Sequence, residues 1–251
     1  MSDILDKINL SEHNIQTFYG CLFLHDFLWF SSSEISRIST TIPVIHNYAL
    51  TYAINQFSYA IYQGNTPRYF EDLEKFSCYS TPARSFASRR ESIMYNAIDD
   101  LRQTPGRDTD KYNSPKYGFK TVLVPEFASR FEKENPIAFK FYLFTFNGFI
   151  PPSVVRLGKK NIPARIYWEQ IQSSTAQFSP DEKSPSHPVN PLDVNGEITG
   201  GIISKIPPHS FYRYASIKND WFIEQKKDKS EKHIIQIPKR ILQRMGLTNG
   251  S

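Results

Sequence analysis

The first third of the chain changes from one hydrophobic period to another. An apolar run at residues 21–24 passes His25 and Asp26, continues to Phe30 and meets three serines, which predicts a strand that ends in a polar loop. Beyond Pro43, apolar residues recur at steps of one, three and four, as on one face of an amphipathic helix: Val44, Ile45, Tyr48, Ala49, Tyr52, Ala53 and Phe57. A strand followed by such a helix is the first half of a β-α-β unit, and His46 and Asn47 fall in the first turn of the helix.

Further along, the pattern predicts alternating short elements. Residues 15–24 read as the first strand, 69–76 as two helical turns, 78–83 as an extended segment, 119–124 as a strand and 127–134 as a short helix. Residues 1–14 are polar and predict a loosely held start.

Residues 137–149 give the strongest strand signal, and because both faces are apolar we expect this strand to be central. Residues 154–157 and 164–168 predict a hairpin with a basic tip at 158–161. Short strands are expected after residue 196, with a final basic helical turn at 239–245.

A basic excursion separates two of the predicted strands. Residues 84–116 contain Arg84, Arg89, Arg90, Arg102, Arg107, Lys111 and Lys116. The apolar residues between 93 and 101 suit one amphipathic helix, and the excursion reads either as an arm inserted into a sheet or as a flexible surface loop.

This order of elements predicts an α+β fold, compatible with a ferredoxin-like antiparallel sheet of the RNA-recognition type with an inserted thumb and a β-rich C-terminal extension. We expect a ferredoxin-like domain at 1–172 with the insertion at about 84–116. Residues 173–195 are rich in Ser and Pro, which predicts a mobile linker or loop, and 196–251 would form the extension.

Composition limits the possible locations of the protein. The 251 residues are 39% hydrophobic and 22% charged, as in a globular protein, and no apolar run reaches the length of about 18 residues that a membrane span needs. The start lacks the features of a signal peptide, so we expect a cytoplasmic protein with no membrane contact. Cys21 and Cys78 lack metal-ligand spacing and are expected to be free thiols in apolar surroundings.

Charge is unevenly distributed. Residues 1–36 carry a net charge of −4, whereas residues 154–168 hold four basic residues and no acid, and residues 203–244 hold ten basic and four acidic residues. This segregation suggests a face for an anionic partner, with a merely solvated basic surface as the alternative.

Two histidines are candidates for chemistry. His25 and Asp26 together could share a metal, but an orienting hydrogen bond is the better account, because a metal site would need further ligands. His46 could act as a general base for RNA cleavage or be a capping or core residue, which we favour. No nucleophile elbow, P-loop or Cys-x-x-Cys pattern is present, so we expect no catalytic residues, no metal and no cofactor.

Residues 156–160 are the best binding candidate. Gly158 would allow backbone amides to approach an anion, and Arg156, Lys159 and Lys160 would supply charge for phosphates. The alternative is a hairpin turn with solvated lysines.

Several short motifs occur in a recognisable order: Leu24-His25-Asp26, Glu34-Ile35 with Arg37, the run from Ile45-His46-Asn47-Tyr48 to Ile54, Tyr79-Ser80-Thr81-Pro82-Ala83, Val155-Arg156-Leu157-Gly158-Lys159 and Asn190-Pro191-Leu192-Asp193. Together they resemble the Cas-five-type subunit of subtype I-D CRISPR Cascade complexes, in the RAMP superfamily, over about residues 18–169.

The resemblance implies a non-catalytic RNA-binding subunit that caps the backbone of a surveillance complex, holds the 5′ handle of the guide RNA and contributes to DNA target recognition. It implies a β-hairpin thumb that contacts the backbone (Cas-seven-type) subunit, and another face for the large subunit, with target DNA as a further candidate partner. We expect RNA contacts at Arg37, His46, Asn47, Arg84, Arg89, Arg90, Arg107, Lys111, Arg156, Gly158, Lys159 and Lys160.

Two other functions stay open. One is a metal-independent endoribonuclease that matures CRISPR repeat RNA, with His46 or His25, a Tyr and a Lys such as Lys159. The other is a basic adaptor that binds only protein.

Overall fold

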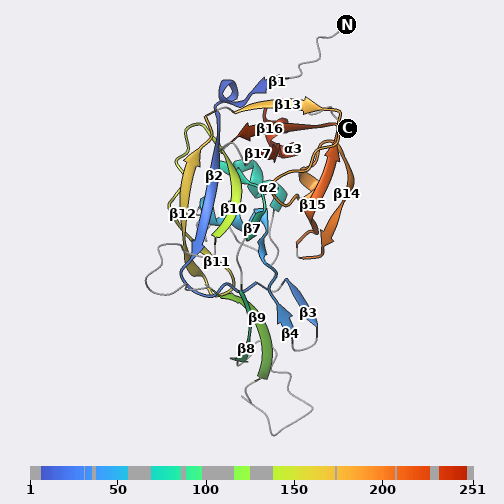
Figure 1. Ribbon diagram of the computed structural model, residues 1–251. Helices are drawn as coiled ribbons and strands as arrows, with labels where there is room; N and C mark the ends of the chain where they lie inside the picture. The colour runs from blue at the N-terminus through green and yellow to red at the C-terminus, as the bar shows by residue number, and fades with distance from the viewer. Residues whose placement is uncertain are drawn as a thin grey trace.

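The computed structural model describes residues 7–30, 32–35, 38–55, 69–85, 89–97, 116–124, 138–172, 174–206, 208–226 and 232–247 (Figure 1). Most of its elements are β-strands, and nearly all strand pairs are antiparallel. No helix among these residues is long and apolar enough to cross a membrane.

The largest sheet is built on two long strands, β2 (Ile15–Leu24) and β10 (Ala138–Phe146), which pair along their whole length. β12 (Ile162–Gln170) pairs with the other edge of β2 and also with β11 (Val154–Leu157). β6 (Cys78–Ser80) and β7 (Ala83–Ser85) pair with β10, and β5 (Val44–Ile45) pairs with β7. The predictions of a first strand at 15–24, a central strand and a hairpin at 154–168 are therefore confirmed.

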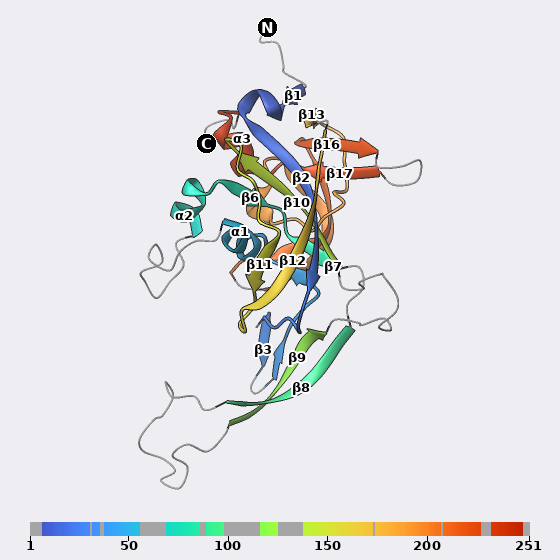
Figure 2. The same cartoon turned by 90° about the vertical axis from the view of Figure 1, so that its left-hand side faces the viewer.

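β10 is central because strands pair with both of its edges and apolar side chains from both of its faces pack in core clusters, as its mainly apolar run predicts. Phe139, Phe141 and Leu143 belong to a core cluster with helix α1 (Asn47–Asn55) and β11. Tyr142 and Phe144 belong to a second cluster with the C-terminal strands. Figure 2 shows α1 on one side of the sheet and β16 with β17 on the other.

The first helix starts three residues later than its hydrophobic stripe predicts. Val44 and Ile45 pair with Arg84 and Ala83 as β5, so the chain is extended there and α1 begins at Asn47. Leu50 and Ile54 of α1 are fully buried, which explains the apolar period. The predicted second helix is confirmed as α2 (Tyr69–Lys75).

The basic excursion forms a hairpin rather than the amphipathic helix that residues 93–101 predicted. β8 (Arg89–Ala97) pairs with β9 (Lys116–Val124) over nine residue pairs, and β9 also pairs in parallel with β4 (Ile38–Thr40), which pairs with β3 (Ser33–Ile35). We call β8 and β9 the thumb hairpin. Residues 98–115 and the helix predicted at 127–134 lie outside the described residues.

The Ser- and Pro-rich segment is part of the folded structure rather than a mobile linker. It contains β13 (Thr175–Ser179), which pairs with β1 (Lys7–Asn9) and with β16 (Asp220–Lys226), itself paired with β17 (Lys232–Gln236). His187 and Asn190 are buried, since polar residues that hydrogen-bond inside a core can be ordered whatever their loop propensity. Of residues 1–14, which the sequence predicted to be loosely held, residues 7–14 are packed: Ile8 and Leu10 are buried, and a 3-10 turn (Leu10–His13) follows β1. Residues 1–6 lie outside the described residues.

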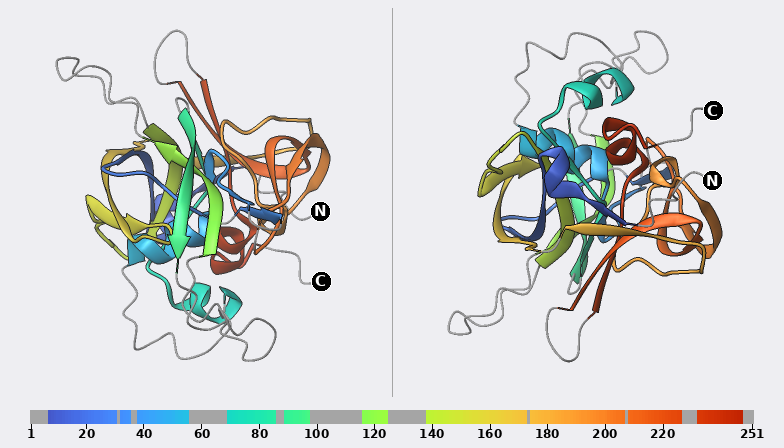
Figure 3. Two further views of the ribbon diagram at one scale, coloured as in Figure 1. Left: turned by 90° about the horizontal axis from the view of Figure 1, so that it is seen from below. Right: turned by 90° about the horizontal axis from the view of Figure 1, so that it is seen from above.

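The remaining C-terminal elements are a two-stranded sheet, β14 (Glu197–Ser204) with β15 (Phe211–Lys218), and helix α3 (Lys239–Arg244). Seen from below, β12 and β15 lie on opposite flanks with the thumb hairpin between them (Figure 3). The thumb hairpin therefore projects from the lower end of the main sheet, between its two sides.

Candidate nucleic-acid interface

The basic tip joins β11 to β12 in a tight turn. Gly158 has a φ of +72° and Asn161 a φ of +53°, and the Asn161 amide donates to the Gly158 carbonyl at 3.0 Å. Arg156 reaches across the turn and donates to the Asn161 carbonyl at 3.1 Å. The turn leaves Lys159 and Lys160 exposed.

The tip packs on the loop at residues 25–30, which follows β2. The Lys159 amide donates to the Trp29 carbonyl at 2.9 Å, and its ammonium nitrogen lies 5.2 Å from the centre of the Trp29 ring. Lys160 lies 4.3 Å from the centre of the Phe27 ring. A cation over an aromatic face is attracted by the ring quadrupole, so these rings hold both ammonium groups at the surface.

Gly158 therefore has a packing role at this turn, and the anion contact that the sequence suggested there stays a prediction. A Cβ at this position would lie 2.8 Å from the Trp29 carbonyl oxygen and 3.0 Å from Leu28. The neighbouring Lys159 amide is already used by Trp29, so it does not face an incoming phosphate.

Gly158→Ala should lower the free energy of unfolding by about 2 kcal/mol, because a side chain in the left-handed region costs about 1–2 kcal/mol and the Cβ also meets fixed backbone. Chemical denaturation of the unaltered chain and of Gly158→Ala would measure this change in the free energy of unfolding. Gly148→Ala is a control that isolates the backbone strain, since Gly148 has a φ of +74° with no atom within 4 Å of a Cβ. A loss no larger than that of the control would contradict the packing role.

The same loop holds the base of the thumb hairpin. Leu28 and Leu123 of β9 exchange backbone hydrogen bonds at 2.8 and 2.9 Å, and both side chains are fully buried. The tip and the thumb hairpin are thus joined through one short loop at the lower end of the sheet, as Figure 2 shows for β11, β12 and β9.

The other basic residues that were predicted to contact RNA fall into three groups. Arg89 and Arg90 lie on β8, with Arg90 exposed. Arg84 on β7 is exposed and stacks on Tyr214 of β15, with its guanidinium carbon 4.7 Å from the ring centre and a 2.8 Å hydrogen bond to the phenol oxygen. Arg37, Arg107 and Lys111 lie outside the described residues.

His46 and Asn47 are not at the surface, so contact with RNA is not supported for either. His46 is 6% exposed; the Tyr48 amide donates to its Nδ1 at 3.2 Å, which leaves Nε2 to donate to the His209 carbonyl at 3.2 Å. Burial lowers the pKa of His46 to about 4, so the ring is neutral near pH 7. The segment that covers this turn comes from far along the chain, which the local pattern could not show.

Asn47 belongs to a buried polar cluster that sequence reasoning did not identify. Its amide donates to Asp193 at 2.9 Å, and the Tyr79 hydroxyl donates to the other oxygen of Asp193 at 2.7 Å. Asn190 donates to the side-chain oxygen (Oδ1) of Asn47 at 3.3 Å, and Gln236 donates to the Asp193 backbone carbonyl at 2.9 Å. Burial raises the pKa of Asp193 to about 7, although its donors and the charge of Arg240 act in the opposite direction.

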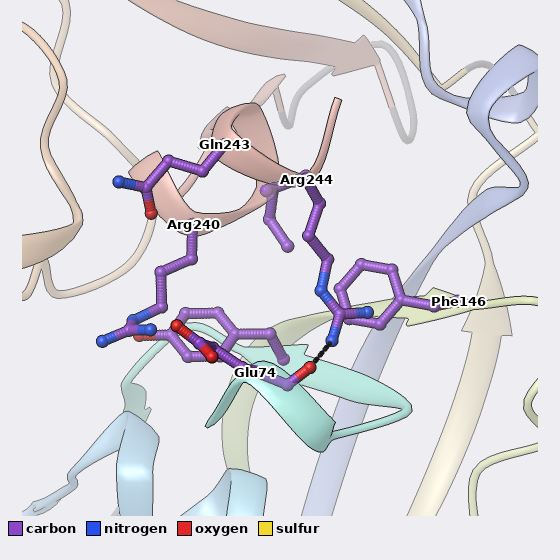
Figure 4. Close-up of a pocket in the computed structure, with 7 residues that line it drawn as sticks. Glu74, Phe146, Arg240, Gln243 and Arg244 are labelled. Carbon is purple, nitrogen blue, oxygen red and sulfur yellow. Dashed lines mark hydrogen bonds between the residues drawn. The ribbon is translucent and has the colours of Figure 1, made fainter. Parts of the chain in front are cut away.

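A pocket of about 400 Å³ lies beside this cluster between α2 and α3 (Figure 4). Arg240 and Gln243 of α3, Glu74 of α2 and Tyr79 are among the residues that line it, and Figure 4 shows the Arg240 side chain extending from α3 toward Glu74. Arg244 donates to the backbone carbonyls of Glu74 and Phe76 at 2.6 and 2.9 Å and lies 3.9 Å from the Phe146 ring centre. Arg244 therefore fastens α3 to the end of α2.

The described residues give no support to a metal at His25 and Asp26. Both side chains are exposed, and Asp26 accepts from the neighbouring Phe27 amide at 2.7 Å. Within this part of the chain, no group of three or more His, Cys, Asp or Glu side chains is placed to hold a metal ion.

Comparison with known proteins gives one family match. The model of the family described as "Type I-D CRISPR-associated protein Cas5/Csc1" matches residues 15–243. A chain of the cryo-EM structure of the Type III-B Cmr-beta bound to cognate target RNA and AMPPnP is similar over 93% of this chain and 90% of that chain, with 8% identity and a TM-score of 0.43. No curated protein matches this chain.

Proposed function

The chain belongs to the type I-D CRISPR-associated Cas5/Csc1 family, and from this membership we propose that it is a non-catalytic RNA-binding subunit of a type I-D surveillance complex. In this role it caps the backbone of the complex, holds the 5′ handle of the guide RNA and contributes to target recognition. A cytoplasmic location is part of the same proposal.

The arrangement of the tip carries the proposal. Lys159 and Lys160 are held over Trp29 and Phe27, within reach of solvent, and Arg156 is exposed on the strand that leads to them. Contacts to phosphates fix the position of a nucleic acid without reading its sequence, which suits a subunit that binds the constant part of a guide. Base pairing between guide and target then supplies the sequence specificity.

The order of the strands supports an RNA-recognition fold. Across the sheet the strands lie in the order β12, β2, β10, and then β7 with β6. Numbered by their order along the chain, these strands are the fourth, first, third and second, and every neighbouring pair is antiparallel. We take this to be a ferredoxin-like sheet in which α1 is the first crossover and β11 replaces the second helix. The thumb hairpin is then the insertion that reaches the backbone subunit, and a separate face contacts the large subunit, with target DNA as a further candidate.

His46→Ala should remove no chemical step, because the ring is buried, neutral and bonded on both nitrogens. It should lower the free energy of unfolding by about 1–3 kcal/mol, since the buried Tyr48 amide and the partly buried His209 carbonyl lose their partner. Incubation of both proteins with repeat RNA, followed by gel analysis, measures the first effect, and chemical denaturation measures the second. Cleavage by the unaltered chain that falls about 10²-fold or more in the variant would establish the endoribonuclease instead.

The decisive experiment is purification of the complex through this subunit, followed by RNA extraction and mapping of both RNA ends. Intact guides with a uniform 5′ handle, whose handle cross-links to this subunit, are expected. Fresh cleavage of repeat RNA by the isolated chain would favour the endoribonuclease. Absence of an RNA cross-link would favour an adaptor that binds only protein.

A further inference from the structure

The face of the main sheet that lies away from α1 carries a row of aromatic and basic side chains. Directly paired residues of antiparallel strands project from the same face, and so do residues two apart along a strand. Tyr167 pairs with Cys21, Cys21 with Lys140 and Lys140 with Arg84, which places one residue from each of β12, β2, β10 and β7 side by side.

The next row on this face continues the pattern. Phe23 pairs with Arg165, and Arg165 pairs with Val154 at the edge of the sheet. The Phe23 and Tyr167 rings meet edge to face with their centres 5.4 Å apart. Neither of these two rows contains an Asp or Glu.

C-terminal strands cover only part of this face. One row higher, Tyr19 and Tyr142 are 8% and 3% exposed, and the Tyr142 hydroxyl meets His233 of β17 at 2.5 Å. In the rows described above, Tyr167 is 59% exposed, Arg165 is exposed and Phe23 is half-buried. The lower rows are therefore open to a ligand, whereas in the upper row Tyr19 and Tyr142 are part of the core and Glu169, which pairs with Tyr19, is exposed on β12.

Arg84 extends the open face onto the C-terminal sheet. Its guanidinium lies over the ring of Tyr214, which is 50% exposed. The open face thus has an exposed aromatic ring at each flank, Tyr167 on β12 and Tyr214 on β15, with Lys140 and Arg84 between them. Adjacent strands lie about 4.8 Å apart, so the four strands span about 14 Å.

We propose that this open face, which we call the aromatic platform, binds single-stranded RNA by stacking bases on Tyr167 and Tyr214 while Arg165, Lys140 and Arg84 neutralise the phosphates. The proposal rests on the proposed function and adds a second contact to it, on a different face from the lysines of the tip. Four-stranded RNA-recognition sheets stack two or three bases on aromatic residues of this kind, and the absence of carboxylates in the two rows favours a polyanion over a protein of mixed charge.

The test measures the binding of the full chain to a short labelled oligouridylate, by fluorescence anisotropy. Tyr167→Ala should raise Kd about 5- to 150-fold, which corresponds to the stacking of one base at about 1–3 kcal/mol. Tyr167→Phe keeps the ring and should restore most of the lost affinity. Arg165→Gln should weaken binding and lower the salt slope by about 0.7, whereas Arg213→Gln, an exposed arginine of β15 outside the two rows, should not.

A native thiol gives an independent readout of where the RNA lies. Cys21 is half-buried in the middle of the platform, whereas Cys78 is fully buried and burial raises its pKa to about 12, so an alkylating reagent should report on Cys21. Bound oligouridylate should slow the alkylation of Cys21 in the unaltered chain and in Arg213→Gln, but less in Tyr167→Ala at the same RNA concentration.

The outcomes separate this inference from the proposed function. If the oligouridylate binds but Tyr167→Ala and Arg165→Gln leave both Kd and Cys21 alkylation unchanged, the platform is wrong and the tip remains as the RNA contact. If the same variants lose a protein subunit from the purified complex while RNA binding is intact, the face is a protein interface and the inference fails. If neither the chain nor the complex binds RNA, the proposed function itself fails.

Discussion

Replacing Lys159 and Lys160 together by alanine should weaken the binding of single-stranded guide RNA about tenfold at 0.15 M salt. Each phosphate that a lysine neutralises contributes about −0.7 to the slope of log affinity against log salt, so the double variant should lose about 1.4 from the slope. Extrapolated from 1 M to 0.15 M salt, that change in slope corresponds to about one order of magnitude in affinity.

The measurement is a salt titration of RNA affinity for the unaltered chain and the double variant. Lys7→Ala with Lys205→Ala is a matched control, because it removes two exposed lysines that lie on β1 and after β14, away from the tip. We also expect a loss of about 1 kcal/mol in stability, since each lysine gives up a cation–π contact with Trp29 or Phe27. An unchanged salt slope would show that the tip is only a solvated turn.

The hydrophobic pattern predicted the strands of the main sheet because the spacing of apolar residues that marks a strand depends only on residues close together in the sequence. Strand β10 buries apolar residues from both of its faces. The turn between β11 and β12 contains Gly158 and Asn161, and Gly and Asn are residue types that adopt a positive φ at low cost. The same pattern left residues 93–101 ambiguous, since a short apolar run fits either a helix or a strand. Pairing with β9, which supplies the backbone partners, decides for a strand.

The candidate site was harder to predict because burial depends on distant segments. His46 and Asn47 stand in the first turn of a helix, where either solvent or protein could cover them. The segment at 190–209 covers them through Asn190, Asp193 and the His209 carbonyl, more than 140 residues away. Nothing in the spacing around residue 46 carries this information.

Several of the short motifs that carry the family resemblance nevertheless contact one another in the folded chain, so these motifs have a structural role. Asn47, Tyr79, Asn190 and Asp193 come from three separate motifs and form one hydrogen-bonded cluster. The Gly158 motif meets the loop that follows Leu24-His25-Asp26 through the Trp29 carbonyl. One set of motifs thus joins the C-terminal strands to the main sheet, and the other joins the tip to the base of the thumb hairpin.

Disruption of the buried cluster should cost the most stability of any single change considered for this chain. Asp193→Ala leaves the Tyr79 hydroxyl and the Asn47 amide without their acceptor, and each such loss costs about 1–3 kcal/mol, so we expect about 3 kcal/mol or more. Tyr79→Phe removes one donor and should cost about 1–2 kcal/mol. Tyr167→Phe is the matched control for the loss of a hydroxyl, since its ring is 59% exposed, and its stability should be nearly unchanged.

The pH dependence of the free energy of unfolding should report whether Asp193 is protonated in the folded chain. Its pKa is about 7 in the folded chain, against 3.8 when exposed, so between these values the folded state holds a proton that the unfolded state has released. The free energy of unfolding should therefore fall as pH rises from about 4 to about 7, by up to about 1.4 kcal/mol per unit from this group, and stay level above pH 7. The buried carboxyl of Asp220, with a pKa of about 6, acts in the same direction, whereas His46 and His187, with pKa values of about 4, act in the opposite one.

Asp193→Asn isolates the contribution of Asp193 to this pH dependence, because the amide has nearly the same shape as the carboxyl group and does not titrate. The other three titrating groups are unchanged in the variant, so they cancel when the two proteins are compared at each pH. The unaltered chain should lose stability relative to Asp193→Asn as pH rises from 5 to 7, and the difference should become constant above about pH 7. Urea denaturation at a series of pH values measures this difference. A difference independent of pH would show that Asp193 is ionised in the folded chain throughout, stabilised by Arg240 and its hydrogen-bond donors against the cost of burial.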